Sequence, residues 1–468
     1  MKTNIPERIA ALREVMKEKK IDAYIIPSSD PHLSEYPADR WKSRSWISGF
    51  DGSAGTVVIT ADKAGLWTDS RYFLQAGIQL EGSGIELYKL ALPETPTIPE
   101  FLLHELQSGQ TVGTDGLTYS VAEAAKLEKA LKRKEIRLET AYDLIDLIWK
   151  DRPAVPGNPL FEMPVELSGK AVHEKLDEIN NHLRKEGADC GILAALDEVA
   201  WTFNIRGTDV TYNPVVISYA FISEDESVLF IDPKKITAEA SDNLKKEGVV
   251  LADYTMIQKY LSRLPENSRV FIDPAKTNIS LYNALPKGCT IIEGITPANH
   301  LKSIKNETEI KGFRNATVKD GIALTRFYIW LEKKLAAGEK VTELDASARL
   351  TALRAEQPQY IMDSFESITG YAGHGAIVHY APTPETDVEL KPESLLLMDS
   401  GAQYLDGTTD ITRTVALGEP TEQMKKDFTR TLKGMIGIAK CKFPAGIRGC
   451  LLDVLARKAL WDAGINYL

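Results

Sequence analysis

Two aspartates near residue 400 lie in a pattern that could bind metal ions. Asp399 ends an apolar run over residues 395–398, and Asp410 precedes a β-branched run that begins at Ile411. Asp406-Gly407 lies between the two runs, and this dipeptide favours a hairpin turn with positive φ angles. A buried carboxylate costs several kcal/mol unless a partner or a cation offsets it. We therefore expect two antiparallel strands that hold Asp399 and Asp410 around a divalent cation such as Mn²⁺, Mg²⁺ or Zn²⁺.

Structural roles are the alternative for these acidic residues. Asp406 is explained by the turn itself, whereas a strand-end aspartate bound to backbone amides would be the simpler explanation of Asp399 and Asp410. Upstream, residues 370–380 form a glycine-rich segment with a predicted short strand over residues 376–378, followed by His379. A histidine at that place could donate a hydrogen bond to a carbonyl oxygen as negative charge develops. An isolated histidine is more often structural. We therefore assign a catalytic role to His379 only because the aspartate pair follows it in the sequence.

Length and composition restrict the class of protein. The chain has 468 residues, of which 43% are hydrophobic and 26% charged, so we expect a globular protein of two or three domains. The net charge is −10 and no basic block is present, which argues against a nucleic-acid partner. No apolar run reaches about 18 residues and the N-terminal residues lack an apolar stretch, so we expect no membrane span and no export signal. Four cysteines without CxxC spacing fit reduced thiols and a cytoplasmic location.

The elements that must position these side chains come in three groups. Residues 1–155 predict an amphipathic helix from Ile5 to Met16, a strand over 22–26, a glycine-rich turn over 46–55 and a strand over 56–60. The same order recurs in residues 156–302, with a helix over 172–183 and strands over 189–193, 215–222 and 227–232. A proline-rich linker over 151–159 separates the two copies. We interpret them as one α/β domain present twice, although coincidence between two ordinary αβ units would give the same pattern.

Residues 303–468 predict a third domain of α+β type. A long helix should run from about residue 306 to 335, and a second helix should begin after a capping box formed by Thr342 and Asp345. The hairpin follows. The residues of the long helix that we expect to face a core are Ile310, Phe313, Thr317, Ile322, Leu324, Phe327 and Leu331.

The segment from Asp399 to Thr414, Asp-Ser-Gly-Ala-Gln-Tyr-x-Asp-Gly-Thr-Thr-Asp-x-Thr-Arg-Thr, resembles the metal-binding hairpin of aminopeptidase P, the Xaa-Pro aminopeptidase of the pita-bread metallopeptidases. Other stretches resemble the three-domain form of this family: Glu35-Tyr36, residues 48–56, residues 196–201 and Asn213-Pro214-Val215. The resemblance implies two creatinase-N-type α/β domains followed by a pita-bread catalytic domain.

The resemblance also implies an activity. Enzymes of this family release the N-terminal residue from peptides with proline in second place, by a hydroxide held between two divalent metal ions, for which Mn²⁺ is expected and Zn²⁺ or Co²⁺ are alternatives. Asp399 and Asp410 would hold the metal ions, and His379 matches the family's catalytic histidine, which binds the scissile carbonyl oxygen. His374 occupies a position usually held by asparagine and receives no role. Partners would be Xaa-Pro peptides and, in the full-length protein, a second copy of the chain in a homodimer.

Two arginines receive roles from the same resemblance. Arg71 follows Trp67-Thr68-Asp69 as in the family pattern, which implies that it reaches the substrate pocket from the first domain; a surface salt bridge to Asp69 is the alternative. Arg413 is expected to pair with a carboxylate of the hairpin.

The sequence departs from the family in its ligand set. The family also uses one histidine and two glutamates as ligands, and residues 460–468 resemble the segment immediately before its His-Gly-x-Gly-His motif. We therefore expect a shortened chain that has little or no activity and whose third domain exposes apolar surface, although Leu451, Leu452, Leu455 and Leu460 should face its core. One alternative is an inactive pita-bread protein that binds peptides or proteins. Another is a related hydrolase such as prolidase or creatinase, against which the three-domain length and the residues around Asp399 argue.

Overall fold

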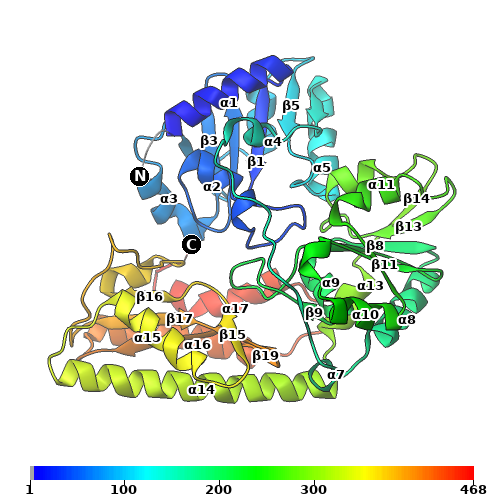
Figure 1. Ribbon diagram of the computed structural model, residues 1–468. Coiled ribbons are helices and arrows are strands. Elements are labelled where there is room, and N and C mark those ends of the chain that lie inside the picture. Colours follow the sequence, from blue (N-terminus) through cyan, green and yellow to red (C-terminus); the bar gives the residue numbers. More distant parts are fainter. Residues whose placement is uncertain (1–4, 468) are drawn as a thin grey trace. The chain divides into compact units, whose positions relative to one another are not determined.

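The computed structural model describes residues 5–467. The chain forms two compact units. Unit 1 extends to Thr325 and also contains Thr351–Glu366 and Ser400–Asp410, whereas unit 2 contains Arg326–Leu350, Ser367–Asp399 and the chain from Ile411 onward. Figure 1 follows the elements from blue to red along the sequence.

Unit 1 contains two six-stranded sheets with the same topology. The first has the order β4-β3-β2-β1-β5-β6 and the second β12-β11-β10-β8-β13-β14. In both, the first strand pairs antiparallel with the second and parallel with the fifth, and the outer pairs are parallel. The strands are β1 (Ala23–Pro27), β2 (Thr56–Thr60), β3 (Ala64–Thr68), β4 (Glu86–Lys89), β5 (Thr111–Thr114), β6 (Arg137–Glu139), β8 (Cys190–Leu193), β10 (Ser218–Ser223), β11 (Ser227–Ile231), β12 (Val249–Ala252), β13 (Arg269–Ile272) and β14 (Thr290–Glu293). Identical order and direction confirm the predicted repeat.

Amphipathic helices cover these sheets. α1 (Ile5–Lys19) buries Ile9, Leu12 and Met16, and its counterpart α8 (Val172–Lys185) buries Leu176, Ile179 and Leu183. Both helices match the predicted spans. The other helices of this part are α2 (Ser43–Ser48), α3 (Phe73–Gln79), α4 (Ile98–Glu105), α5 (Val121–Leu131), α6 (Leu144–Ile148), α7 (Val165–Ser168), α9 (Leu196–Thr202), α10 (Ala238–Lys246), α11 (Ile257–Leu261), α12 (Ile279–Asn283) and α13 (Pro297–Ser303), and a two-stranded ladder joins β7 (Phe161–Glu162) to β9 (Ile205–Arg206).

Two local predictions in this part were wrong. The first half of the expected turn over residues 46–55 is helical, because α2 continues to Ser48 and ends at Gly49, whose φ of 74° closes the helix. The strand expected from residue 215 begins only at Ser218.

The two copies contact each other within unit 1. The amide of Val121 donates to the carbonyl of Thr277 at 3.0 Å, and the amide of Ile279 donates to that of Tyr119 at 2.9 Å. His32 of the first copy is buried, and its Nδ1 lies 2.8 Å from the carbonyl oxygen of Ala194 in the second. Burial lowers the pKa of His32, so a neutral imidazole fixes the loop that continues to Glu35-Tyr36.

The remaining chain is of α+β type, as predicted. Its helices are α14 (Glu307–Ala336), α15 (Glu343–Ala355), α16 (Glu422–Ala439) and α17 (Gly449–Trp461), and its strands are β15 (Tyr360–Asp363), β16 (Ile368–Tyr371), β17 (Leu395–Ser400), β18 (Ala402–Tyr404), β19 (Gly407–Thr408) and β20 (Ile411–Ala416). One three-stranded sheet has the order β15-β18-β19 and another β16-β17-β20. The capping box of α15 is confirmed, because Asp345 N donates to Thr342 Oγ1 and Thr342 N to the Asp345 carboxylate.

The buried face of α14 differs from the predicted one. Leu324, Phe327 and Leu331 are buried as expected, but Phe313 and Ile322 are 40% and 47% exposed. Thr317 is also exposed, and the buried row starts instead with Gly312, Ala316 and Asp320. Asp320 is paired there with Arg354, whose Nε lies 2.6 Å from Asp320 Oδ1, so a buried ion pair replaces apolar packing in that part of the helix.

The two predicted strands are present as β17 and β20, but they are not joined by a tight turn at Asp406-Gly407. They are neighbours in one sheet, and a separate short hairpin lies between them in sequence: β18 pairs antiparallel with β19 through Gln403↔Thr408 and Tyr404↔Gly407, which leaves Leu405 and Asp406 as its turn. Neither Asp406 nor Gly407 has a positive φ, so that part of the prediction was wrong. Gly407 is needed for close packing, because a Cβ there would lie 3.0 Å from the Cβ of Ala316 on α14.

Helices α16 and α17 expose much apolar surface, which confirms the expectation for the third domain. The exposed large side chains on these helices are Phe428, Leu432, Met435, Ile436, Ile438, Leu451, Val454 and Trp461. Leu451 was expected to face the core and is 62% exposed. Among residues 5–467, no helix combines the length and apolarity that crossing a bilayer requires.

Candidate functional site

Asp399 has a carboxylate oxygen without a hydrogen-bond partner. It is the fifth residue of β17 and lies opposite Ile368 of β16. Leu396 and Met398 on the alternate face are buried, so the strand directs Asp399 away from that core face. Its Oδ1 is buried and receives no hydrogen bond, and the Oγ of Ser400 is in the same state. A buried, unsatisfied carboxylate oxygen requires a cation or water, which fits the predicted role as a metal ligand.

Asp410 directly precedes β20, the neighbour of β17 in its sheet. Within unit 1, hydrogen bonds join the residues before and after the β18–β19 hairpin at its base. Ser364 Oγ donates to the carbonyl of Thr409 at 2.8 Å, and Ala402 N donates to Thr409 Oγ1 at 3.0 Å. A Cβ at Gly401 would overlap that same Thr409 carbonyl, so only glycine permits this approach. The hairpin is therefore closed two residues after Asp399 and one residue before Asp410.

A complete metal-binding cluster is not found in the described part of the chain. Among residues 5–467, no group of three or more histidine, cysteine, aspartate or glutamate side chains has the arrangement of a metal site.

Arg71 forms the salt bridge that was the alternative prediction. Its Nε and Nη2 donate to the two carboxylate oxygens of Asp69, both at 2.8 Å, and its side chain is 39% exposed. This bidentate pairing raises the pKa of Arg71 and fixes the guanidinium plane. One edge of the group therefore stays accessible while its orientation is set by Asp69.

Tyr36 connects Arg71 with Asp410 within unit 1. Burial raises the pKa of Tyr36 to about 12. The negative charge of Asp410 adds to this rise, and the positive charge of Arg71 opposes it. Burial and the charges of Glu35 and Tyr72 have larger effects on this phenol, so Arg71 and Asp410 are minor charges within electrostatic range of Tyr36.

Two further residues of this neighbourhood were missed by sequence reasoning. Tyr212, from the second copy, meets Tyr36 edge to face with ring centroids 6.3 Å apart. Gln403, in the hairpin, donates from Nε2 to the carbonyl of Tyr212 at 3.0 Å. The one sequence feature that could have drawn attention to Tyr212 is the adjacent Asn213-Pro214, which belongs to a stretch that resembles the family. In the structure, Tyr212 has a φ of 69°.

His379 lies in unit 2, after a turn where a strand was predicted. β16 is followed by a 3₁₀ helix over Ala372–Ala376, and the amides of Ile377 and Tyr380 bond to carbonyls three residues earlier. The strand prediction for residues 376–378 was wrong, because three-residue turn bonds replace a ladder there. His379 itself is half-buried.

Two further side chains, Arg413 and His374, have hydrogen-bond partners that the sequence did not predict. Arg413 donates from Nη1 to the adjacent Thr412 carbonyl at 2.7 Å, and the described residues show no ion pair for it, so the predicted pairing with a hairpin carboxylate is not found. His374, which received no predicted role, places Nδ1 3.0 Å from both oxygens of the Glu343 carboxylate.

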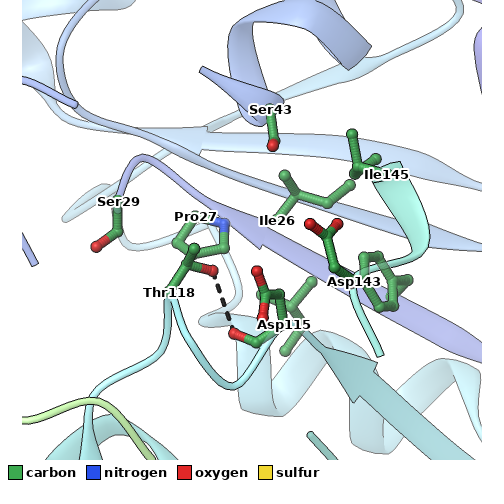
Figure 2. A pocket seen from close by; sticks show the side chains of 10 residues that line it. Ile26, Pro27, Ser29, Ser43, Asp115, Thr118, Asp143 and Ile145 are labelled. Carbon is green, nitrogen blue, oxygen red and sulfur yellow. Dashed lines mark hydrogen bonds between the residues drawn. The ribbon is translucent and has the colours of Figure 1, made fainter. Parts of the chain in front are cut away.

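A separate pair of carboxylates lies in the first copy. Asp115 and Asp143 line a small cavity together with Ser43 and Thr118, as Figure 2 shows. Burial, followed by the charge of Asp143, raises the pKa of Asp115 to about 7. Asp115 Oδ1 accepts the amide of Leu117 at 2.9 Å, and Asp143 is paired with Arg152 and accepts the amide of Asp146, so both carboxylates have structural partners.

Three segments match sequence profiles of known domains. The Creatinase/Prolidase N-terminal domain matches residues 8–148 and, as a second type, residues 151–309. Metallopeptidase family M24 matches residues 311–468.

Whole-chain relatives have the same organisation. A probable Xaa-Pro aminopeptidase P from Laccaria bicolor is 40% identical, over 99% of this chain and 73% of its own length. Aminopeptidase P2 from Arabidopsis thaliana is 37% identical, over 100% of this chain and 70% of its own. The crystal structure of X-prolyl aminopeptidase from Caenorhabditis elegans, described as a cytosolic enzyme with a di-nuclear active site, has a TM-score of 0.93 at 33% identity and covers 99% of this chain and 78% of that one.

Proposed function

Since the chain belongs to the Xaa-Pro aminopeptidase P family of M24 metallopeptidases, we propose that it acts as a metal-dependent aminopeptidase on peptides whose second residue is proline. The reaction would release the N-terminal residue by hydrolysis of the Xaa–Pro bond. The observation that supports this most directly is the buried, unpartnered Oδ1 of Asp399, because hydrolysis in this family needs a carboxylate reserved for a cation.

Asp399 and Asp410 would hold two divalent ions as part of a larger ligand set. Their donors are hard carboxylate oxygens, which suit Mn²⁺, with Zn²⁺ or Co²⁺ as alternatives. Bound divalent ions activate water at neutral pH and polarise a carbonyl group. The closed base of the hairpin, where Gly401 meets Thr409, would fix the backbone that leads to Asp410.

The remaining residues would bind and orient the peptide. His379 would donate a hydrogen bond to the scissile carbonyl oxygen and stabilise the charge that develops on it. Arg71, oriented by Asp69, would contact the substrate from the first copy. This arrangement agrees with the shared influence of Arg71 and Asp410 on Tyr36.

Assembly and location follow from the family resemblance. We expect the protein to form a homodimer in the cytoplasm, as the C. elegans relative is described as cytosolic. Light scattering coupled to size exclusion would test the dimer, and a monomeric mass at micromolar concentration would contradict it.

Metal binding tests the assignment of the two aspartates. We expect Mn²⁺, titrated into a polypeptide of residues 1–468, to bind weakly, and binding to fall at least tenfold in D399N and in D410N. D406N is the matched control, because Asp406 lies in the same hairpin but is occupied by Lys319, whose Nζ is 2.7 Å from its Oδ1. Calorimetry or Mn²⁺ electron paramagnetic resonance gives the affinity. Equal affinity in D399N and wild type would refute the assignment.

Hydrolysis tests the activity separately. We expect the chain, with added Mn²⁺, to release the N-terminal residue from an Xaa-Pro-Pro peptide. Rapid hydrolysis by this polypeptide would show that its own residues form a sufficient site. Hydrolysis of Xaa-Ala peptides at the same rate as Xaa-Pro peptides would contradict the proposed specificity.

A further inference from the structure

A buried glutamate in unit 2 receives every hydrogen bond from one short segment. Glu343 is the first residue of α15 and is 0% exposed. Its carboxylate accepts the amide of Tyr371 at 2.7 Å and the hydroxyl of Tyr380 at 2.8 Å. It also accepts Nδ1 of His374, 3.0 Å from each oxygen. All three donors lie in residues 371–380, the segment that contains His379.

The burial of this carboxylate depends on those donors. An ionised carboxylate without hydrogen bonds costs several kcal/mol in a protein interior, and the positive end of α15 offsets only a part of that. Removal of the segment from its place would leave Glu343 buried and unsatisfied. The carboxylate is therefore stable only when residues 371–380 adopt this conformation.

The backbone of the segment makes few hydrogen bonds outside its own turns. Among the described residues, its backbone after β16 forms three-residue turn bonds, Gly375 packs against the backbone of Gly370, and Gly373 has open space around it. Ala372 has a φ of 48°, a conformation that is unfavourable for a residue with a side chain. Such a segment would sample several conformations without a fixed anchor.

Tyr380 transmits the anchoring to the neighbouring histidine. Tyr380 is 7% exposed, and its ring lies against the imidazole of His374 with centroids 4.3 Å apart and the planes tilted by 32°. Its amide closes a turn on the carbonyl of Ile377 at 3.0 Å. The backbone on both sides of His379 is thus fixed, and two of the three anchors are side chains on either side of it.

From this geometry we propose that Glu343 is a positioning residue for His379, with His374 as one of the hydrogen-bond donors to Glu343. The proposal rests on the role proposed above for His379. Glu343 does not touch the substrate; its carboxylate selects the conformation of residues 371–380 in which His379 can reach the scissile carbonyl oxygen. It also gives a role to His374, the position that departs from the family pattern.

The test compares E343Q with a matched buried glutamate. The glutamine of E343Q retains the size of the side chain but replaces one acceptor oxygen by a donor, which opposes at least one of the three bonds. The control is E198Q in the second copy, because Glu198 is also 0% exposed and accepts bonds from Thr296 Oγ1 at 2.6 Å and Asn299 Nδ2 at 3.0 Å. Its partners do not include the His379 segment.

Two measurements on residues 1–468 report on the position of His379. Amide exchange of peptides covering 370–381 should become at least tenfold faster in E343Q and remain unchanged in E198Q. With ¹⁵N-histidine labelling, the chain gives signals from seven histidines, and the signal lost in H379Q identifies His379. Its imidazole shifts and titration midpoint should change in E343Q and not in E198Q. Unchanged exchange and titration in E343Q, or equal effects of both variants throughout the protein, would overturn the proposal.

An activity measurement separates this proposal from the proposed function. In a form of the protein that hydrolyses Xaa-Pro peptides, E343Q should lower kcat by at least tenfold with a smaller change in KM, and E343D should restore a part of it. If no form hydrolyses such peptides, the proposed function fails, whereas the exchange and titration results still decide the role of Glu343. A raised KM with unchanged kcat would contradict the positioning role.

Discussion

Replacing Gly312 by alanine should displace the hairpin that leads to Asp410. Gly312 lies on α14, and a Cβ at this position would overlap the carbonyl oxygen of Asp406 and lie 3.1 Å from its carbonyl carbon. The neighbouring atom is backbone, so it cannot rotate away. Asp406 is also held on its other side, because its carboxylate pairs with Lys319.

The same helix contains a matched control at Gly321. A Cβ there meets nothing within 4 Å, so G321A should stabilise the helix by about 0.5–1 kcal/mol, the usual gain of alanine over glycine. G312A receives the same gain but must move the hairpin backbone by roughly 1 Å, and such overpacking costs about 1–3 kcal/mol. The two variants should therefore differ by about 1–3 kcal/mol in the free energy of unfolding of this region.

Amide exchange of β18 and β19 under native conditions measures this difference locally, which avoids the assumption that a chain of this size unfolds in one step. Peptides covering residues 402–409 should exchange about 5- to 100-fold faster in G312A than in G321A. Mn²⁺ binding should also weaken in G312A only, because the hairpin leads directly to Asp410. Equal or slower exchange in G312A would refute the reasoning that glycine is required there for close approach.

Two further changes test charges that the fold buries. Burial and the charge of Asp143 raise the pKa of Asp115 to about 7 in the folded protein, from about 4 in the unfolded chain. As pH rises, the unfolded state therefore loses this proton before the folded state does. The free energy of unfolding should consequently fall between about pH 4 and pH 7. D115N should reduce that fall by up to about 4 kcal/mol, measured as urea midpoints at pH 4.5 and 8; an unchanged pH dependence would contradict it. K319M should destabilise the hairpin by about 3 kcal/mol, because Asp406 is left buried without its cation. Amide exchange of residues 402–409 measures this loss. The double variant K319M/D406N should recover a part of the lost stability, whereas additive losses from the two changes would exclude coupling between these side chains.

Much of the architecture could be predicted from local patterns. The helix periodicity of α1 and α8, the strands that follow them and the capping box at Thr342 depend on residues close in sequence. Two copies of such a pattern were sufficient to predict the repeat, and the equal strand orders of both sheets confirm it. The strands of Asp399 and Asp410 were found for the same reason as β17 and β20, but the hairpin of β18 and β19 between them was not predicted.

The errors come from contacts between distant residues. Asp406-Gly407 was assigned to a positive-φ turn, but Gly407 is required by the approach of α14. Ile322 was expected in a core and is 47% exposed, because the helix packs through small residues and the Asp320–Arg354 pair. Sequence periodicity indicates which face of a helix is apolar, but it does not show which residues from distant parts of the chain pack against that face.

The sequence by itself determined the family, the repeated α/β domain and the candidate ligands Asp399 and Asp410, because these depend on residue types at fixed spacing. Only the tertiary structure decided that one oxygen of Asp399 has no donor, that Arg71 and Asp410 act on the same Tyr36, and that Glu343 anchors the His379 segment. The physical reason is that burial and hydrogen-bond satisfaction are properties of a whole environment, which residues far apart in the chain create together.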